Sequence, residues 1–215
     1  MKQLAPGVRQ LKGFPKNSIN AYLVEDVLID AGAFFTQRAV LKQLEGVKLS
    51  AHALTHAHFD HDGASAAVAK RHGVPVWAGE KDVAAVERGK QIGRVPGLGE
   101  RFLPSAAKVK VDRALKEGDE VAGFIVLDTP GHSPGHVSYW RESDRVLLCG
   151  DVMWGYNPFT FMKGVREPFS MLSPDPQLNR ESAKRLAELR PELVCFGHGP
   201  PLRDPDVFAA AVARL

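Results

Sequence analysis

The feature that most constrains this chain is a run of nine residues, 55–63, that holds three histidines and two aspartates between an apolar stretch and a helical period. Side chains two positions apart point to the same side of an extended backbone, so His56 and His58 can share one metal ion. Asp60 and His61 lie where the chain turns into the helix, and they can face a second ion beside the first. Imidazole and carboxylate groups suit zinc, iron or manganese.

A simpler explanation of the run is a solvated turn in which Asp62 caps the following helix. Such a turn does not need three histidines and two aspartates in nine positions. Metal binding is therefore the favoured interpretation, and further ligands are expected elsewhere in the chain.

Three more residues of ligand type stand directly after apolar, strand-like runs. His132 ends the sequence Thr-Pro-Gly-His, in which the Pro-Gly turn holds it rigidly at a strand end. Asp151 and His198 follow two other apolar runs. Any one of them alone would more often be an ordinary loop residue. Their shared position after strands predicts that they all converge on one end of the sheets.

Strand-like and helical periods alternate along the chain, and no low-complexity linker divides it. Two successive halves of strands and helices predict one α+β domain over residues 1–215, with helices outside two sheets. A loop is expected at residues 93–104. Leu178 and Val207 are expected on the buried faces of the last two helices. We predict strands at 20–24, 27–29, 49–54, 75–78, 108–111, 124–127, 146–149 and 194–196, and helices near 36–46, 64–72 and 82–88 and from Asp175 and Asp204.

Composition limits the class of partner. The net charge of +3 is small and the basic residues are dispersed, so we expect a small-molecule substrate and no nucleic acid. No apolar run approaches a membrane span, and residues 1–17 lack a signal-peptide pattern, so a cytoplasmic location is expected. Cys149 and Cys195 lie in apolar segments and are expected to be buried free thiols.

Taken together, these segments resemble the metal-binding motifs of the metallo-β-lactamase superfamily, from HxHxDH at residues 56–61 to Gly-His-Gly at 197–199. The resemblance begins at residues 20–23 and covers nearly the whole chain. It implies an αββα sandwich with two metal ions at the open edge between the sheets. It also implies a ligand set, in which one metal is held by His56, His58 and His132, the other by Asp60, His61 and His198, and both by the bridging Asp151.

Such a site would leave room for a water between the metals. Two cations would lower the pKa of that water, giving hydroxide near neutral pH, and would polarise a carbonyl group. Asp60 lies beside the water and is the predicted catalytic residue. The expected cofactors are two divalent metal ions, with zinc preferred and manganese or iron as alternatives.

Other residues are expected around the metals. Asp30 matches a buried aspartate of the superfamily that supports the histidine-rich loop, and His136 is interpreted as a supporting residue rather than a ligand. The segment after Asp151 is rich in aromatic side chains. We expect several of them to line an apolar mouth beside the metals, namely Trp154, Tyr156 and Phe159.

The motifs are most similar to those of the glyoxalase II-like hydrolases, which implies hydrolysis of an ester, thioester or lactone. Only about one helix follows His198, whereas glyoxalase II carries a C-terminal helical region that grips glutathione. Trp154 also stands where acyl-homoserine lactonases have a tyrosine. Two alternatives remain open: a persulfide dioxygenase-like oxidoreductase with a single iron, and a non-catalytic metal-binding module.

Overall fold

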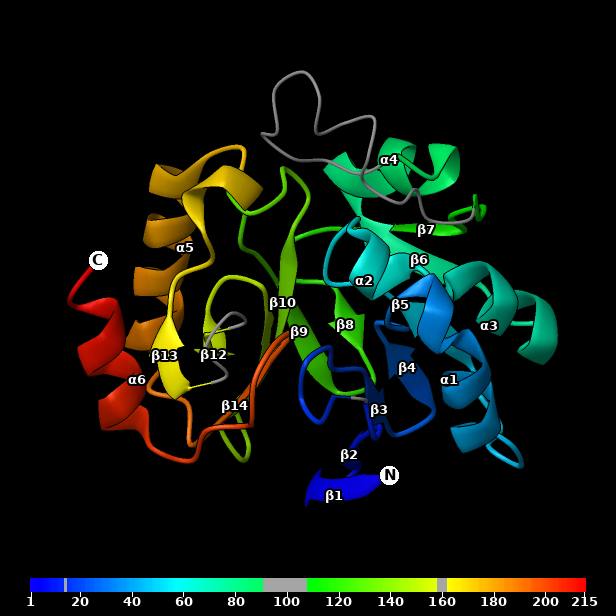
Figure 1. The fold of residues 1–215 in the computed structure, drawn as a ribbon, viewed down its shortest axis with the longest axis horizontal. Coiled ribbons are helices and arrows are strands. Elements are labelled where there is room, and N and C mark those ends of the chain that lie inside the picture. Colours follow the sequence, from blue (N-terminus) through cyan, green and yellow to red (C-terminus); the bar gives the residue numbers. More distant parts are fainter. Residues whose placement is uncertain (14, 91–107, 158–161) are drawn as a thin grey trace.

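The computed structural model describes residues 1–13, 15–90, 108–157 and 162–215. Within them the chain forms two sheets that pack face to face, with helices on both outer faces (Figure 1). This is the αββα sandwich that the sequence predicts. The loop expected at residues 93–104 and the side chain of Phe159 lie outside the described residues.

The described strands fall into two large sheets and one hairpin. The first sheet follows chain order through β1 (Lys2–Ala5), β2 (Val8–Gln10), β3 (Tyr22–Val24), β4 (Val27–Ile29), β5 (Ala51–Ala53), β6 (Val76–Gly79) and β7 (Arg113–Leu115). The second runs β14 (Leu193–Phe196), β11 (Val146–Gly150), β10 (Val137–Arg141), β9 (Phe124–Asp128) and β8 (Glu120–Val121), and the hairpin is β12 (Trp154–Tyr156) with β13 (Lys163–Arg166). In the first sheet, strands β1 to β4 are antiparallel and strands β4 to β7 are parallel. In the second sheet β11 pairs parallel with β14, and the other pairs are antiparallel.

Helices cover the outer faces of the two sheets (Figure 1). Buried side chains of α1 (Gln37–Gln43), α3 (Ser65–His72) and α4 (Val83–Arg88) pack on the first sheet. Those of α5 (Pro176–Glu188) and α6 (Pro205–Val212) pack on the second. The short helix α2 (Phe59–Asp62) lies within the histidine-rich run, and the 3-10 turns are η1 (Phe34–Thr36), η2 (Glu80–Asp82) and η4 (Ser170–Leu172).

The main core lies between the sheets, where apolar side chains of both inner faces interlock. Phe124 and Leu148 are 1% exposed, and burying a side chain of this size stabilises the fold by about 1.5–3 kcal/mol. The hydroxyl of Tyr139 donates a hydrogen bond to Leu54 O at 2.7 Å, which ties the second sheet to the first just before the histidine-rich run. The sandwich therefore holds its ligand-bearing edge rigidly.

The last two helices begin where the sequence predicts. The carboxylate of Asp175 accepts a hydrogen bond from Leu178 N, and that of Asp204 accepts from Asp206 N and Val207 N. In both helices a proline occupies the first turn, where no backbone donor is needed. These capped starts confirm the predicted helices.

Three local predictions are wrong. Residues 108–111 are not a strand; pairing with β6 begins only at Arg113, and Val109 and Val111 instead pack beside α4. Leu178 and Val207 are 36% and 45% exposed rather than buried. The side of α5 that faces the sheet includes polar residues. Asn179 and Ser182 donate hydrogen bonds to Val152 O and Pro130 O in neighbouring loops. The buried residues of α5 are therefore Asn179, Ser182, Ala183 and Leu186.

No helix among the described residues is long and apolar enough to span a bilayer.

Both cysteines are free and fully buried, and burial raises the pKa of Cys195 to about 12 and that of Cys149 well above its ordinary value. Because the thiolate is the reactive form, we expect neither thiol to react with a disulfide reagent such as Ellman's reagent at pH 8 in the folded protein. Both should react after unfolding in guanidinium. Rapid labelling of either cysteine in the native protein would contradict this placement.

Candidate metal centre

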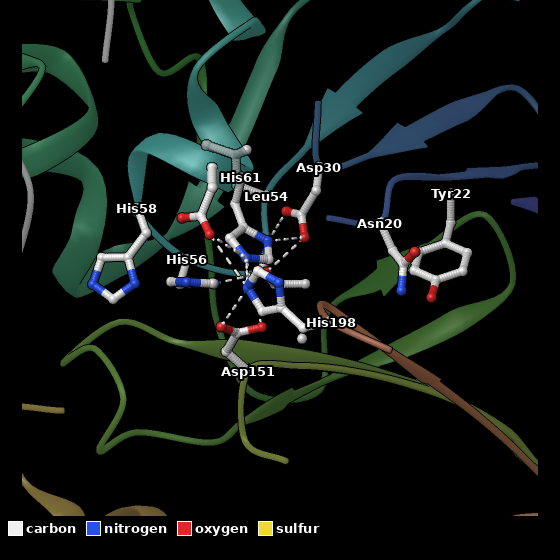
Figure 2. A network of polar contacts seen from close by, with 12 residues as sticks. Asn20, Tyr22, Asp30, Leu54, His56, His58, His61, Asp151 and His198 are labelled. Atoms are coloured by element: carbon white, nitrogen blue, oxygen red, sulfur yellow. Dashed lines mark hydrogen bonds and ion pairs between the residues drawn. The ribbon is translucent and has the colours of Figure 1, made fainter. Parts of the chain in front are cut away.

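The predicted ligands come from loops and from one short helix at the same edge of the two sheets. His56 and His58 follow β5, Asp60 and His61 lie on α2, and the other three follow strands of the second sheet. Figure 2 shows His56, His61, Asp151 and His198 pointing toward one another. Within the described residues three groups have ligand atoms within 4.8 Å of one another, namely His56–His58–His132, His56–His61–Asp151 and Asp60–His61–His198.

The group of His56, His58 and His132, which we call the first trio, has the spacing of a metal site. His58 Nδ1 lies 3.0 Å from His132 Nε2. Two nitrogens bound about 2.0–2.1 Å from a tetrahedral zinc ion would be roughly 3.3 Å apart. His56 Nε2 is buried and has no hydrogen-bond partner, while its Nδ1 contacts Thr55 Oγ1 at 2.9 Å. A metal ion would satisfy this orphaned nitrogen, so the residues fit the ion.

The second trio consists of Asp60, His61 and His198. His61 Nε2 and His198 Nε2 are 3.3 Å apart, and Asp60 Oδ2 lies 3.3 Å from His198 Nε2. The backbone oxygen of Ser18 contacts His198 Nδ1, so the imidazole turns its other nitrogen toward the site. The three ligand atoms therefore face one point, as a second metal ion requires.

The carboxylate of Asp151 lies between the two trios. Its Oδ1 is 3.5 Å from His61 Nε2, and its Oδ2 is 3.5 Å from His132 Nε2 and 3.1 Å from His198 Nε2. A Cβ at Gly197 would come within 2.0 Å of Asp151 Oδ1, so the glycine is needed for this approach. One carboxylate thus reaches the ligands of both trios, which is the position of a metal bridge.

The carboxylates and histidines shift one another's charge. Burial lowers the pKa of His61, but Asp151, Asp30 and Asp60 outweigh it and raise the pKa to about 9. Burial raises the pKa of Asp151, yet the nearby His198 and His61 hold it well below its ordinary value. The carboxylate of Asp151 is therefore ionised and attracts positive charge, which a bound cation supplies as well as a proton does.

The two predicted supporting residues both contact the ligand loops. Asp30 Oδ2 lies 2.9 Å from His61 Nδ1, and both of its oxygens accept hydrogen bonds from Thr55, at 2.8 Å each. His136 Nε2 accepts a hydrogen bond from Asp151 N at 3.1 Å. Burial lowers the pKa of His136 to about 3, so it stays neutral and can accept that hydrogen bond.

The predicted aromatic lining is placed differently from the open mouth that the sequence suggests. Trp154 and Tyr156 are only 4% and 8% exposed. The Trp154 ring packs against the His198 ring with centroids 5.1 Å apart, and the Tyr156 hydroxyl donates to Ser18 O at 3.2 Å. Trp154 thus packs on the His198 ring, and Tyr156 bonds to the same backbone oxygen of Ser18 that contacts His198. Phe159 lies outside the described residues.

Several contacts that hold the ligand loops are not predictable from the sequence. Asn20, which Figure 2 labels, precedes β3, and its Nδ2 donates to Phe196 O and Gly199 O, at 2.9 and 2.8 Å, so it holds the backbone on both sides of His198. Ser173 Oγ lies 3.1 Å from His132 Nδ1. These residues are remote in sequence from the ligands that they hold, so no local pattern marks them.

Comparison with known proteins agrees with this geometry. Residues 15–198 match the family model of the metallo-beta-lactamase superfamily. The chain is 30% identical over 200 residues to the probable metallo-hydrolase YflN of Bacillus subtilis (strain 168). The aligned region covers 82% of this chain and 76% of that protein. It is 28% identical to a hydroxyacylglutathione hydrolase of Bdellovibrio bacteriovorus over 69% of this chain and only 48% of that enzyme. The crystal structure of TTHA1623 in a di-iron-bound form has 33% identity and a TM-score of 0.70, covering 100% of this chain and 98% of that one.

The two histidines of the segment 129–136 offer a matched test of the ligand assignment. His132→Ala removes one of three ligands from the first trio, so we expect about half of the bound metal to be lost and activity to be abolished. His136→Ala removes no ligand but does remove the acceptor of Asp151 N and a contact to Thr129 Oγ1, and it should weaken metal binding or activity by ~10–100-fold. Metal per chain, measured by mass spectrometry after dialysis, distinguishes the two. The reverse order of effects would show that the ligands are assigned in the wrong register.

Proposed function

The chain belongs to the metallo-β-lactamase superfamily, and from that membership we propose that it is a two-metal hydrolase that cleaves an ester, a thioester or a lactone. The observation that carries the proposal is Asp151, whose two carboxylate oxygens lie within 3.5 Å of nitrogens from both trios. A structural site for a single metal ion does not require a carboxylate that reaches two sets of ligands. It is the arrangement expected of a pair of ions that act together.

Each of the two expected ions has a set of residues that would bind it. The first trio would hold one ion, the second trio the other, and Asp151 both, with zinc as the expected metal. When bound, two such ions lower the pKa of a water molecule and polarise the carbonyl group of a substrate. Such a reaction needs no separate serine, cysteine or lysine nucleophile, and the task of the chain is to hold the ligands and to move a proton.

Asp60 is the residue best placed to take up that proton. Its side chain is 19% exposed, whereas that of Asp151 is 3% exposed and that of His61 is fully buried. Burial raises the pKa of Asp60, but His61 and His198 outweigh it and hold the carboxylate ionised. An ionised carboxylate that is partly open to the site can accept a hydrogen bond from an attacking water and orient it.

An apolar cavity close to the metal centre supports the proposal that the substrate has an apolar part. It has a volume of about 420 Å³, and its lining includes Leu11, Ile19, Phe35 and Val40. Two segments that line it also contact the ligand loops. Ser18, which precedes Ile19, contacts His198, and Ala31, which precedes the lining residue Gly32, donates its N–H to His61 O at 2.7 Å.

We propose that this cavity near residues 11–40, rather than the segment of Trp154 and Tyr156, provides the apolar surface beside the metals. A substrate whose reacting carbonyl lies at the metals could extend an acyl chain into this cavity. Each methylene group buried there would strengthen binding by up to ~0.8 kcal/mol, about fourfold in affinity. We propose this as the source of the substrate preference.

Metal loading tests the two-ion hydrolase directly. Protein reconstituted with zinc or manganese should hold about two ions per chain and hydrolyse ester, thioester or lactone substrates without oxygen uptake. Asp151→Ala should lower metal content and abolish activity together, because one carboxylate serves both ions. Asp175→Ala is the control, since that carboxylate caps α5 on the surface and should leave the metal content unchanged. Persulfide-dependent oxygen uptake by a protein that keeps a single iron under every loading condition would favour the dioxygenase instead.

The cavity predicts a dependence on acyl-chain length. Along a series of esters, kcat/KM should rise by up to about fourfold per added methylene until the cavity is filled. Phe35→Ala should flatten this rise, whereas Phe34→Ala, at the adjacent exposed phenylalanine that is not among the cavity-lining residues, should preserve it. A flat series in the unmodified protein would refute the assignment. So would a glutathione thioester that clearly outperforms every acyl ester.

A further inference from the structure

A buried carboxylate outside the ligand set connects the loops of the first trio. Asp82, the last residue of η2, is 0% exposed. Its Oδ2 accepts hydrogen bonds from Ala57 N at 3.0 Å and Ser133 Oγ at 2.5 Å, and its Oδ1 accepts one from Gly135 N at 2.7 Å. Burying an ionised carboxylate is costly unless its oxygens are satisfied, and here three donors satisfy them.

The donors lie beside the metal ligands. Ala57 stands between His56 and His58, and Ser133 directly follows His132. One carboxylate therefore bonds to both loops that together carry the whole first trio. Fixing two loops to a common acceptor sets the distance between their side chains, and here His58 Nδ1 and His132 Nε2 are 3.0 Å apart.

Close backbone packing makes this connection rigid. A Cβ on Gly135 would come within 2.3 Å of Asp82 N, and a Cβ on Gly79 within 1.9 Å of Gly135 O. The loop that follows His132 thus lies directly on the turn that carries Asp82. The carboxylate makes no capping hydrogen bond to its own helix, α4, so helix capping does not explain its burial.

The second trio is supported by other residues. Asp30 contacts His61, Ser18 contacts His198, and neither is bonded to Asp82. We infer that Asp82 is a positioning residue for one of the two metal sites, holding His56, His58 and His132 in the geometry that binds the first ion. The inference rests on the two-ion site proposed above and goes beyond it, because it assigns this carboxylate to one ion only.

The experiment measures zinc affinity at each site separately, by competition with a chromophoric chelator. The His198→Ala background retains an intact first trio, and the His132→Ala background retains an intact second trio. Asp82→Asn preserves the size of the side chain but places an amide N–H₂ where a carboxylate oxygen now accepts hydrogen bonds. It should weaken zinc binding by ~10–100-fold in the His198→Ala background, the range typical of residues that orient metal ligands. In the His132→Ala background zinc affinity should change less than about threefold.

Controls separate positioning from general destabilisation. Val86→Ala truncates a fully buried side chain on α4, the helix that follows Asp82, and should lower Tm without changing zinc affinity. Ser133→Ala removes one of the three donors and should give a smaller shift of the same selectivity, which keeps the test available if Asp82→Asn does not fold.

Equal weakening in both backgrounds, or no more weakening than Val86→Ala causes, would overturn the inference. Zinc binding requires no turnover. If hydrolysis is absent but the selective loss is found, the role of Asp82 stands and the proposed activity fails. If hydrolysis is found but Asp82→Asn weakens zinc binding equally in both backgrounds, the proposed activity stands and the role of Asp82 fails.

Discussion

The compensation of buried charge at one sheet edge is the constraint on which the rest of this structure depends. Asp30 and Asp151 are 2% exposed, and an isolated ionised carboxylate at such a depth would be very costly. Each lies within 3.5 Å of an imidazole nitrogen, and Asp30 also receives donors from Thr55. The histidines in turn keep ligand atoms directed at a common region. Acids and imidazoles are stable there only as a set, which is why the fold must bring all of them together.

The αββα sandwich meets this requirement because the strands that the ligands follow, β5, β9, β11 and β14, end at one edge. The core between the sheets fixes the strand ends, and cross-sheet bonds such as Tyr139 Oη to Leu54 O hold the two halves together. The ligands themselves stand on the loops after those strands, as functional residues commonly do on a rigid scaffold. Buried side chains beneath the loops, Asp30 on one side and Asp82 on the other, then set the orientation of neighbouring ligands.

Local sequence signals predict structure well where they depend on a few adjacent residues. Asp-Pro at 175–176 and 204–205 predicts helix starts because cap and proline act within one turn. The buried face of a helix and the first paired residue of a strand are predicted less well. Leu178 is exposed because α5 turns Asn179 and Ser182 inward to donate to loop carbonyls, and residues 108–111 stay unpaired because sheet pairing begins at Arg113. The hydrophobic periodicity of a segment does not predict these tertiary hydrogen bonds.

The sequence by itself determined the fold class and the set of candidate ligands, because both are encoded locally: apolar runs form the strands, and clustered histidines and aspartates follow them. The tertiary structure alone decided what holds those ligands and what lies beside them. Asp82 gained its position from donors up to 53 residues away, and Ser18 contacts His198 through a backbone oxygen that any residue would supply. The apolar cavity likewise forms between segments that meet only on folding, because a void is a property of packing and leaves no motif in the chain.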